Sequence, residues 1–480
     1  MKQNIEINNL LEFDTVVIGG GVAGCAAAIS SARNGARTLL AEEFGALGGQ
    51  AVMGLVTPLD ARTSRKGEPF GGLLDEISQK TIELSKKYCS RETGKISDIA
   101  SPHILKYVLL TLLDEAGVKI MFHTSLVSCE TENNAIKSAL LFTKSGFVKV
   151  FSKTFIDASG DADLAVASGA EFVKGSEPGC FAALDESGLN HSHYNNNDNN
   201  NDKNYEAYEN NGLMQPTSIF ILMGGVDFEK YNKFNLNNKE LRFGDLDISE
   251  EKFRNWKFCG TPGFEISSDR IPMPQGRVLV THSNRPDVAV INMSRIIGID
   301  GSDAESLNQG EVLAQKQIIA IVDFLISFIP GFENAYYSQS GMTLGIRETR
   351  RIKGRYVLTG LDAINCKKFE SSIARGSYMI DIHDPNGKAR AIGGDLKGDF
   401  YDIPFDCLIS KNIENLLACG RCISADHIAH SSTRIQGTCI LTGQAAGTAA
   451  ALALKSKISV SDLDVSELQE KLITDGVNLK

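Results

Sequence analysis

The sequence predicts an α/β protein in which a Rossmann-like nucleotide-binding domain is combined with a mixed α+β domain. Residues 13–33 contain a β-branched run, a glycine-rich turn and an alanine-rich run, in the order of a βαβ unit. Residues 127–151 contain three short alternating segments, which predict a small β-meander inserted between core strands. The length of 480 residues exceeds one core of ordinary size, so two domains are expected.

The composition is typical of a folded, soluble protein, because hydrophobic residues make up 42% of the chain and charged residues 22%. The 59 acidic residues outnumber the 49 basic ones, which form no cluster, so no nucleic-acid partner is expected. The N-terminus has no apolar run for a signal peptide, and no stretch reaches the roughly 18 apolar residues of a membrane span. We therefore expect a cytoplasmic protein with no membrane partner and with its ten cysteines reduced.

The N-terminal unit begins with residues 13–18, whose β-branched side chains suit a strand buried on both faces. The turn that follows fits the pattern Gly-x-Gly-x-x-Gly, and residues 25–33 form the helix that it opens. Gly35 ends this helix, and residues 36–41 supply the second strand. Strand, turn, helix and strand therefore stand in the order of a dinucleotide-binding unit.

Each residue of the fingerprint has a physical role. Gly19 permits the tight turn, Gly21 lets the backbone approach a pyrophosphate, and Gly24 lets helix and strand pack closely. Glu42 ends the second strand at about the 20-residue spacing at which a carboxylate meets a ribose hydroxyl. These positions predict dinucleotide binding, with the pyrophosphate at the helix N-terminus.

Three further stretches continue this pattern, at residues 44–51, 154–163 and 415–427, and each places glycine beside a predicted strand end. Together with residues 345–351 and 401–405, they resemble the FAD-dependent oxidoreductase family with the glutathione-reductase-type FAD fold. The resemblance covers most of the chain.

The glycine fingerprint alone suits FAD and NAD equally. The resemblance to the family implies that the cofactor is FAD. It also implies that the helix beginning near Gly437 points its N-terminus at the flavin ring, which stabilises negative charge there. The His-Gly-Ala-Gly sequence of the covalently flavinylated fumarate reductase flavoproteins is missing, so FAD is expected to bind non-covalently. The cofactor-binding residues predicted in this way are Gly19, Gly21, Gly24, Glu42, Gly48, Gly49, Val127, Gly160, Asp161, Gly420, Arg421, Asp426, Gly437 and Thr438.

The resemblance also implies a discontinuous FAD-binding domain, formed by residues 1–175 and 405–480. Residues 176–404 then form the substrate domain, with the cofactor at the seam between the two.

Within the substrate domain, strands are predicted in residues 215–226 and 277–290, and a helix over residues 305–328. The polar residues 187–212 cannot bury enough apolar surface to order themselves, so a mobile loop is expected. This loop contains a His-x-His pair beginning at His191, but no third ligand stands at suitable spacing, so no metal site is expected.

Candidate catalytic residues lie between the last predicted strand and the last helix. An imidazole of His427 or His430 would transfer a proton near neutral pH, unless each is a loop residue bonded to backbone. Arg434 would bind the flavin or a substrate carboxylate, or else pair with Asp426.

Other polar groups leave a functional and a structural interpretation open. Arg347, Arg350 and Arg351 would share one face of a helix and form an anion site, or pair with Glu348 and other acids. His383 is expected in a turn, from which it would face the cleft or solvent.

The predicted function is hydride transfer between a small organic substrate and N5 of the flavin. The sequence contains no second strand-Gly-x-Gly-x-x-Gly-helix unit, so electrons are expected to come from an external donor or pass to an external acceptor. Whether the chain forms a homo-oligomer is left open.

Two alternatives use the flavin differently. An electron-transfer subunit would relay electrons to iron–sulfur clusters, which need cysteine clusters that the ten dispersed cysteines do not supply. An isomerase or lyase would use the flavin without net redox turnover.

The Cys-x-x-Cys pair of Cys419 and Cys422 is either a redox dithiol or an incidental spacing next to a buried strand.

Overall fold

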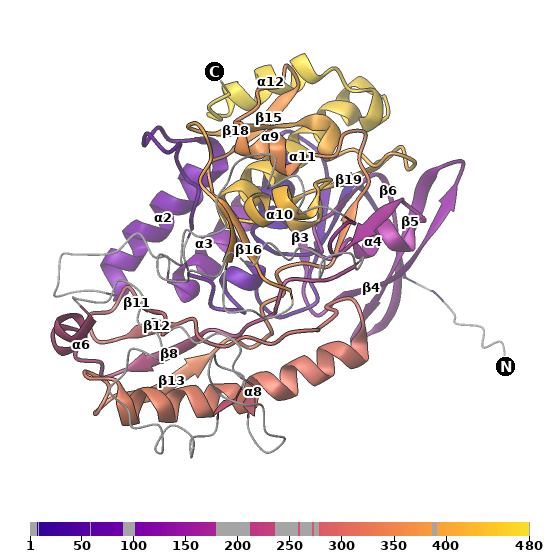
Figure 1. Ribbon diagram of the computed structural model, residues 1–480. Coiled ribbons are helices and arrows are strands. Elements are labelled where there is room, and N and C mark those ends of the chain that lie inside the picture. The colour runs from indigo at the N-terminus through magenta and orange to yellow at the C-terminus, as the bar shows by residue number, and fades with distance from the viewer. Residues whose placement is uncertain are drawn as a thin grey trace.

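The structure is a computed structural model, which describes residues 7, 9–57, 59–89, 101–178, 212–235, 258–259, 271–272, 278–385 and 391–479. All but the last residue of the predicted loop at 187–212 lies outside this set, and so does its His-x-His pair. Figure 1 shows a larger sheet with its helices and, below it, a smaller sheet backed by the long helix α8 (Ala304–Phe328).

A parallel sheet forms the centre of the larger part. Its strands lie in the order β3 (Lys119–Met121), β2 (Thr38–Ala41), β1 (Asn9–Ile18), β6 (Gly146–Asp157) and β19 (Leu416–Ala418). The last residues of neighbouring strands are in register, because Ile18 lies beside both Ala41 and Asp157. The strands therefore end at a common edge, and most of their side chains near that edge are buried.

The predicted meander is present. It consists of β4 (Ser125–Glu132), β5 (Ala135–Thr143) and the first half of β6, joined antiparallel. The second half of β6 pairs with β19 on the side where its first half pairs with β5. On the other side, β1 pairs along nearly the whole of β6. One long strand therefore belongs both to the meander and to the parallel sheet.

Two helices of small residues pack closely against each other beside the parallel sheet. Helix α1 (Val22–Arg33) and helix α11 (Gln436–Ser456) meet where Gly443 and Gly447 face the carbonyl oxygens of Ala23 and Ala27. A Cβ on Gly447 would lie 2.0 Å from the Ala27 oxygen, so only glycine permits this distance. By length and composition α11 would pass for a membrane-spanning helix, but 94% of its apolar window is buried inside the protein.

The smaller part contains an antiparallel sheet with its own apolar core. Its strands are β11 (Val280–His282), β12 (Ala289–Ile291), β8 (Ile221–Gly224) and β13 (Tyr336–Ser340), in that order. Buried side chains of α8 pack in one apolar cluster with this sheet. The helix predicted over residues 305–328 is thus confirmed, and strands lie within or next to both predicted segments.

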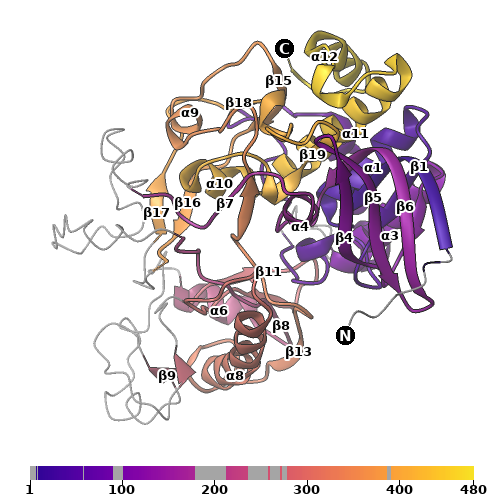
Figure 2. The same ribbon diagram turned by 90° about the vertical axis from the view of Figure 1, so that its right-hand side faces the viewer.

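The remaining helices and strands are shorter or lie at the periphery. They are α2 (Gly72–Cys89), α3 (Pro102–Glu115), α4 (Asp163–Ala167), β7 (Phe172–Lys174), α6 (Phe228–Asn235), β9 (Phe258–Cys259), β10 (Ile271–Pro272), β14 (Arg350–Ile352), α9 (Gly360–Ile364), β15 (Ser372–Gly376), β16 (Ile380–His383), β17 (Ala391–Gly394), β18 (Tyr401–Pro404), α10 (His427–Thr433) and α12 (Val465–Thr474). Figure 2 shows α10 in the middle of the molecule, where it contacts β16.

Two local predictions are wrong. The arginines at 347, 350 and 351 do not share a helix face, because Arg350–Ile352 is the strand β14 and pairs antiparallel with β7. His383 is not in a turn, because it ends β16 and lies opposite Ala391 of β17.

The packing also bears on the predicted domain division. Buried residues between Leu358 and Ile403, which the sequence assigned to the substrate domain, belong to the same apolar cluster as α1 and α11.

Candidate active site

Four loops meet at the edge where the parallel strands end. Gly19 follows β1, Glu42 follows β2, Ala158 follows β6 and Cys419 follows β19. In open parallel sheets, ligands bind in the crevice outside this carboxyl edge. The predicted cofactor motifs are therefore brought together, although they come from opposite ends of the chain.

The first glycine turn is tight on its inner side and open on its outer side. Gly19 has a left-handed φ of 102°, and a Cβ on Gly24 would lie 1.9 Å from the Gly19 carbonyl oxygen. A Cβ on Gly21, which caps α1, would meet nothing within 4 Å. The backbone at Gly21 is therefore accessible at the N-terminus of α1, as approach of a diphosphate requires.

Glu42 is buried and braces this turn. Its Oε2 accepts a hydrogen bond from Gly20 N at 2.5 Å, and its Oε1 accepts one from Phe44 N at 2.7 Å. Burial raises the pKa of Glu42, and these two amides oppose the rise. Each carboxylate oxygen has a second lone pair, which suits a ribose hydroxyl.

The second glycine pair lies against the first turn. Gly48 N donates to Gly20 O at 2.8 Å, and Gly48 has a left-handed φ of 101°. A Cβ on Gly49 would lie 3.1 Å from Gly21 Cα. Glycine at these positions therefore keeps the space beside Gly21 clear.

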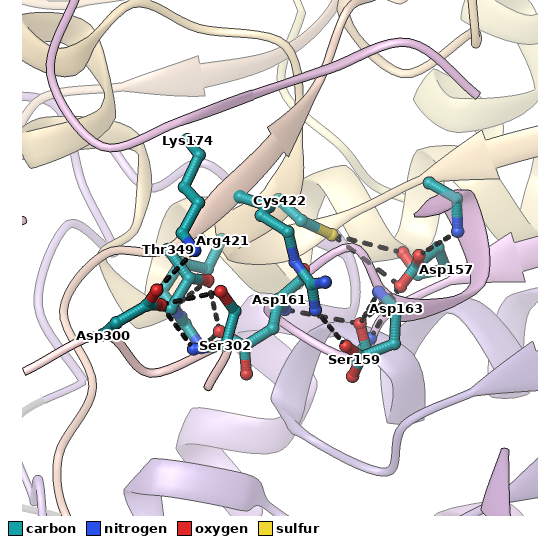
Figure 3. Close-up of polar contacts among 12 residues, drawn as sticks. Asp157, Ser159, Asp161, Asp163, Lys174, Asp300, Ser302, Thr349, Arg421 and Cys422 are labelled. Atoms are coloured by element: carbon teal, nitrogen blue, oxygen red, sulfur yellow. Dashed lines mark hydrogen bonds and ion pairs between the residues drawn. The ribbon is translucent and has the colours of Figure 1, made fainter. Parts of the chain in front are cut away.

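Asp161 and Arg421, from the second and third motifs, form an ion pair. Arg421 Nη2 lies 2.7 Å from Asp161 Oδ1, which also accepts a hydrogen bond from the Thr349 hydroxyl (Figure 3). A Cβ on Gly160 would lie 2.9 Å from Arg421 Nη2, and a Cβ on Gly420 would lie 2.8 Å from Ala23 Cβ. The loops after β6 and β19 are thus locked together beside α1.

The cysteine pair is enclosed by this arrangement. Cys419 and Cys422 are buried free thiols, and Cys422 Sγ lies 3.6 Å from Asp157 O. Burial, and then the charge of Asp157, raise the pKa of both thiols far above the ordinary value. The thiolate that dithiol exchange requires is disfavoured at both positions.

Asp426 has a structural role at the start of α10. Its Oδ1 accepts from Ala429 N at 2.7 Å, and its Oδ2 accepts from Gly360 N at 2.8 Å. Burial raises the pKa of Asp426 to about 6. The expected alternative of an Arg434–Asp426 pair is not formed, because Arg434 Nη2 donates to the backbone oxygen of Asp381 at 3.0 Å.

Glu348 is the centre of a buried ionic network beside α10, and sequence reasoning assigned it no part in the site. Its Oε1 lies 2.6 Å from Arg351 Nη1 and 2.8 Å from His427 Nδ1. Arg351 Nη2 also contacts Glu177 Oε1 at 2.7 Å, and Glu177 Oε2 accepts from His427 N. Burial opposes ionisation of Glu348, but the charges of His427 and Arg351 outweigh it and lower the pKa of Glu348.

Buried polar atoms without hydrogen-bond partners gather between α10 and α11. Among the described residues, both ring nitrogens of His430 lack a partner, as do Thr433 Oγ1, Arg434 Nη1, Gln436 Oε1 and Thr438 Oγ1. A buried unsatisfied polar group costs about 1–3 kcal/mol, and folded proteins contain few of them. This concentration fits a site for a polar ligand such as a flavin ring and its substrate.

Residues 50–60, which precede α2, contact the start of α11. Gln436 Nε2 donates to Val56 O at 2.5 Å, and Gly437 N donates to Asp60 O at 3.2 Å. Gln50 Oε1 and Thr57 Oγ1 are also buried and have no partner within the described ranges. Segments from both ends of the chain thus surround the start of α11.

The other predicted positions are placed as follows. Thr438 is buried in the first turn of α11, next to Gly437. Val127 is on β4 with 49% of its surface exposed. Within the described ranges, no group of three or more His, Cys, Asp or Glu side chains is arranged to hold a metal ion.

Comparisons with known proteins add the following. A family model described as FAD dependent oxidoreductase matches residues 14–472. A search of curated proteins gives no match.

Among solved structures, one similar chain is a geranylgeranyl bacteriochlorophyll reductase-like protein from Thermoplasma acidophilum, with a TM-score of 0.43 and 12% identity over 97% of this chain and 84% of the other. A second is p-nitrophenol 4-monooxygenase from Pseudomonas putida, with a TM-score of 0.41 and 10% identity over 97% of this chain and 84% of the other. A third is an anhydrotetracycline hydroxylase from Streptomyces rimosus, with a TM-score of 0.41 and 10% identity over 96% of this chain and 65% of the other. Similarities this weak carry no inference about the reaction of this chain.

Proposed function

The chain belongs to the family of FAD-dependent oxidoreductases and takes FAD as its cofactor, and from this premise we propose that it transfers hydride between a small organic substrate and N5 of a non-covalently bound flavin. The observation that carries the proposal is the set of buried, unpartnered polar atoms from His430 to Thr438. Bound FAD supplies the two-electron chemistry, and the side chains of this segment bind and orient what reacts with it.

We propose that the carboxyl edge of the parallel sheet holds the cofactor. The open backbone at Gly21 would receive the diphosphate, and the carboxylate of Glu42 would hold the adenosine ribose. Gly437 and Thr438, at the N-terminus of α11, would face the ring, where the helix dipole favours negative charge. The long strand β6, shared by meander and parallel sheet, supports the glutathione-reductase subtype of this fold.

His430 is the proposed proton-transfer residue. Burial, and then the charges of nearby arginines, outweigh the effect of Glu348 and lower the pKa of His430 well below the ordinary value. A neutral imidazole has one acceptor and one donor nitrogen, and in the part of the chain that the structure describes neither has a partner. A negatively charged substrate beside the ring would raise the pKa of His430, which the ring needs in order to accept a proton from a substrate that is being oxidised. His427 is held by Glu348, so we propose that it positions α10.

Anaerobic mixing of the holoenzyme with a panel of small metabolites tests the proposal. A substrate should bleach the flavin absorbance, and an added electron acceptor should restore it. Turnover without bleaching would instead indicate an isomerase or lyase.

The role of His430 is tested by the same assay in the His430→Gln variant. The rate of flavin reduction should fall by about 10²- to 10⁴-fold, the usual contribution of a positioned base, with FAD content unchanged. His282, which stacks on Phe228 in the smaller part, offers a matched control, and His282→Gln should react like the unaltered enzyme. Equal rates in both variants would rule out His430 as the base.

A further inference from the structure

Two arginines, Arg347 and Arg434, differ from neighbouring arginines in having no carboxylate partner among the described residues. Arg350, Arg351 and Arg421 each form an ion pair with an aspartate or glutamate. Arg347 and Arg434 instead bond to neutral backbone oxygens. Arg347 Nη1 donates to Pro216 O at 2.6 Å, and Arg434 Nη2 donates to Asp381 O.

The fold brings these two guanidinium groups into one region. Arg347 contacts Pro216, and the neighbouring Gln215 accepts a hydrogen bond from His383 N at 3.0 Å. His383 lies on β16, the strand that also carries Asp381, whose backbone oxygen Arg434 contacts. Arg434 follows α10, and its backbone N donates to His430 O at 3.1 Å. Both residues are mostly buried, and Arg434 Nη1 is fully buried and has no partner among the described residues.

The local charge is positive and incompletely balanced. Burial, and then the charges of Arg295 and Arg434, lower the pKa of Arg347 well below its ordinary range, with Asp381 opposing them. Burial also lowers the pKa of Arg434, with the charges of Asp381 and Glu348 opposing it. A guanidinium group keeps its proton in proteins, so these shifts mark unfavourable positive charge that a bound anion would relieve.

We infer that Arg347 and Arg434 bind the carboxylate of the substrate, so that the enzyme acts on a small carboxylic acid. The inference rests on the proposed function, because it gives a substrate class to the site next to His430. The planar donor fork of arginine matches a carboxylate in geometry and charge, and an unpartnered nitrogen such as Arg434 Nη1 is available for it. A neutral substrate would leave both positive charges only partly compensated, by Asp381 and Glu348.

The test is a titration of the oxidised holoenzyme with acetate, malonate and benzoate, followed by flavin difference spectra. The corresponding amides serve as neutral probes of the same shape. Carboxylates should give saturable spectral changes and amides none. Arg347→Gln and Arg434→Gln should each weaken binding about 10- to 100-fold, the effect of losing one charge-assisted hydrogen bond.

Three controls separate this role from others. Arg355 is exposed and bonds to Ser461 O, so Arg355→Gln should bind carboxylates normally. Arg347→Lys should recover part of the affinity, because the charge remains while the fork is lost. FAD content should be unchanged in all variants, and a loss of FAD on replacing Arg434 would show that this arginine holds the cofactor instead.

Equal carboxylate affinity in all variants, or no spectral change with any carboxylate, would overturn the inference. Its failure is distinguishable from failure of the proposed function. Flavin bleaching by a neutral substrate would refute the carboxylate site alone, whereas carboxylate binding without bleaching by any metabolite would refute the redox function alone.

Discussion

Glu348 shows how single residues balance buried charge beside α10. Its carboxylate is fully buried and contacts Arg351 and His427, which come from different segments of the chain. A buried charge is tolerated only when its partners are present, so loss of one partner is costly.

Replacement of Glu348 by glutamine should therefore lower the free energy of unfolding by about 3–5 kcal/mol, because it leaves the buried Arg351 undercompensated. Urea unfolding measures this loss. Glu171 pairs with Lys353 and Lys411 at the surface, so Glu171→Gln should cost about 1 kcal/mol or less. Equal losses in the two variants would show that the buried network adds no stability.

The glycines of the first turn should separate folding from cofactor binding. Gly24→Ala places a Cβ against the Gly19 backbone, so the apoprotein should lose about 1–3 kcal/mol of stability. Gly21 has extended backbone, with φ of −63° and ψ of 176°, and open space, so Gly21→Ala should fold normally but bind FAD more weakly. Thermal unfolding of the apoproteins and FAD titration measure both effects. Unchanged FAD affinity in Gly21→Ala would contradict the placement of the diphosphate.

Individual site residues could be predicted from the sequence where they belong to a short local motif. Gly19 to Gly24 and Glu42 lie within one βαβ unit, whose spacing follows from backbone geometry. The Glu348–His427 contact joins residues 79 positions apart, and no pattern along the chain indicates it. The ion pair of Asp161 with Arg421 spans 260 positions and was missed for the same reason.

At the scale of elements, α10 carries the proposed catalytic residue and begins at Asp426, whose carboxyl group is an unusually weak acid. Asp426 caps the helix, and burial raises its pKa to about 6. An unfolded aspartate titrates near about 3.9, so between these values the folded chain retains a proton that the unfolded chain has released. Ionisation of Asp426 therefore disfavours the folded state increasingly as the pH rises from about 4 to about 6.

Comparison of the unaltered apoprotein with Asp426→Asn isolates this effect. The variant has no titrating group at the position, so the unaltered protein should lose about 2 kcal/mol relative to it across this pH window. Chemical unfolding at several pH values between about 4 and 7 provides the measurement. Parallel pH profiles for the two proteins would show that the pKa of Asp426 is not raised.

Elements with a strong periodic pattern were predictable, and elements defined by their partners were not. Helix α8 and strands β1 and β5 lie close to their predicted residues, because their apolar side chains repeat at the spacing of a helix or strand. Arg350 and Arg351 stand three and four residues after Arg347, which is helical spacing, but they form β14, whose conformation is set by pairing with β7. His383 directly precedes the turn signal that begins at Asp384, and its strand conformation is set by the pairing of β16 with β17.

At the scale of the whole molecule, three apolar clusters of described residues organise the chain. One packs the parallel sheet against α1 and α11, a second packs its other face against the meander and α4, and a third contains the smaller sheet and α8. The sequence indicated a discontinuous arrangement, because its motifs stand at both ends of the chain. The sequence places residues up to 404 in the substrate domain, because no pattern along the chain indicates that Leu358 and Ile403 pack in the larger core through tertiary contacts.

The central claim is that four loops at one sheet edge and the segment from His430 to Thr438 hold FAD. Hydrogen–deuterium exchange of the apoprotein and the holoenzyme tests it most directly. FAD should slow exchange in residues 19–24, 42–50, 159–161, 419–422 and 430–438, and should leave the smaller sheet with α8 nearly unchanged. Protection confined to other segments, or none on addition of FAD, would contradict the account.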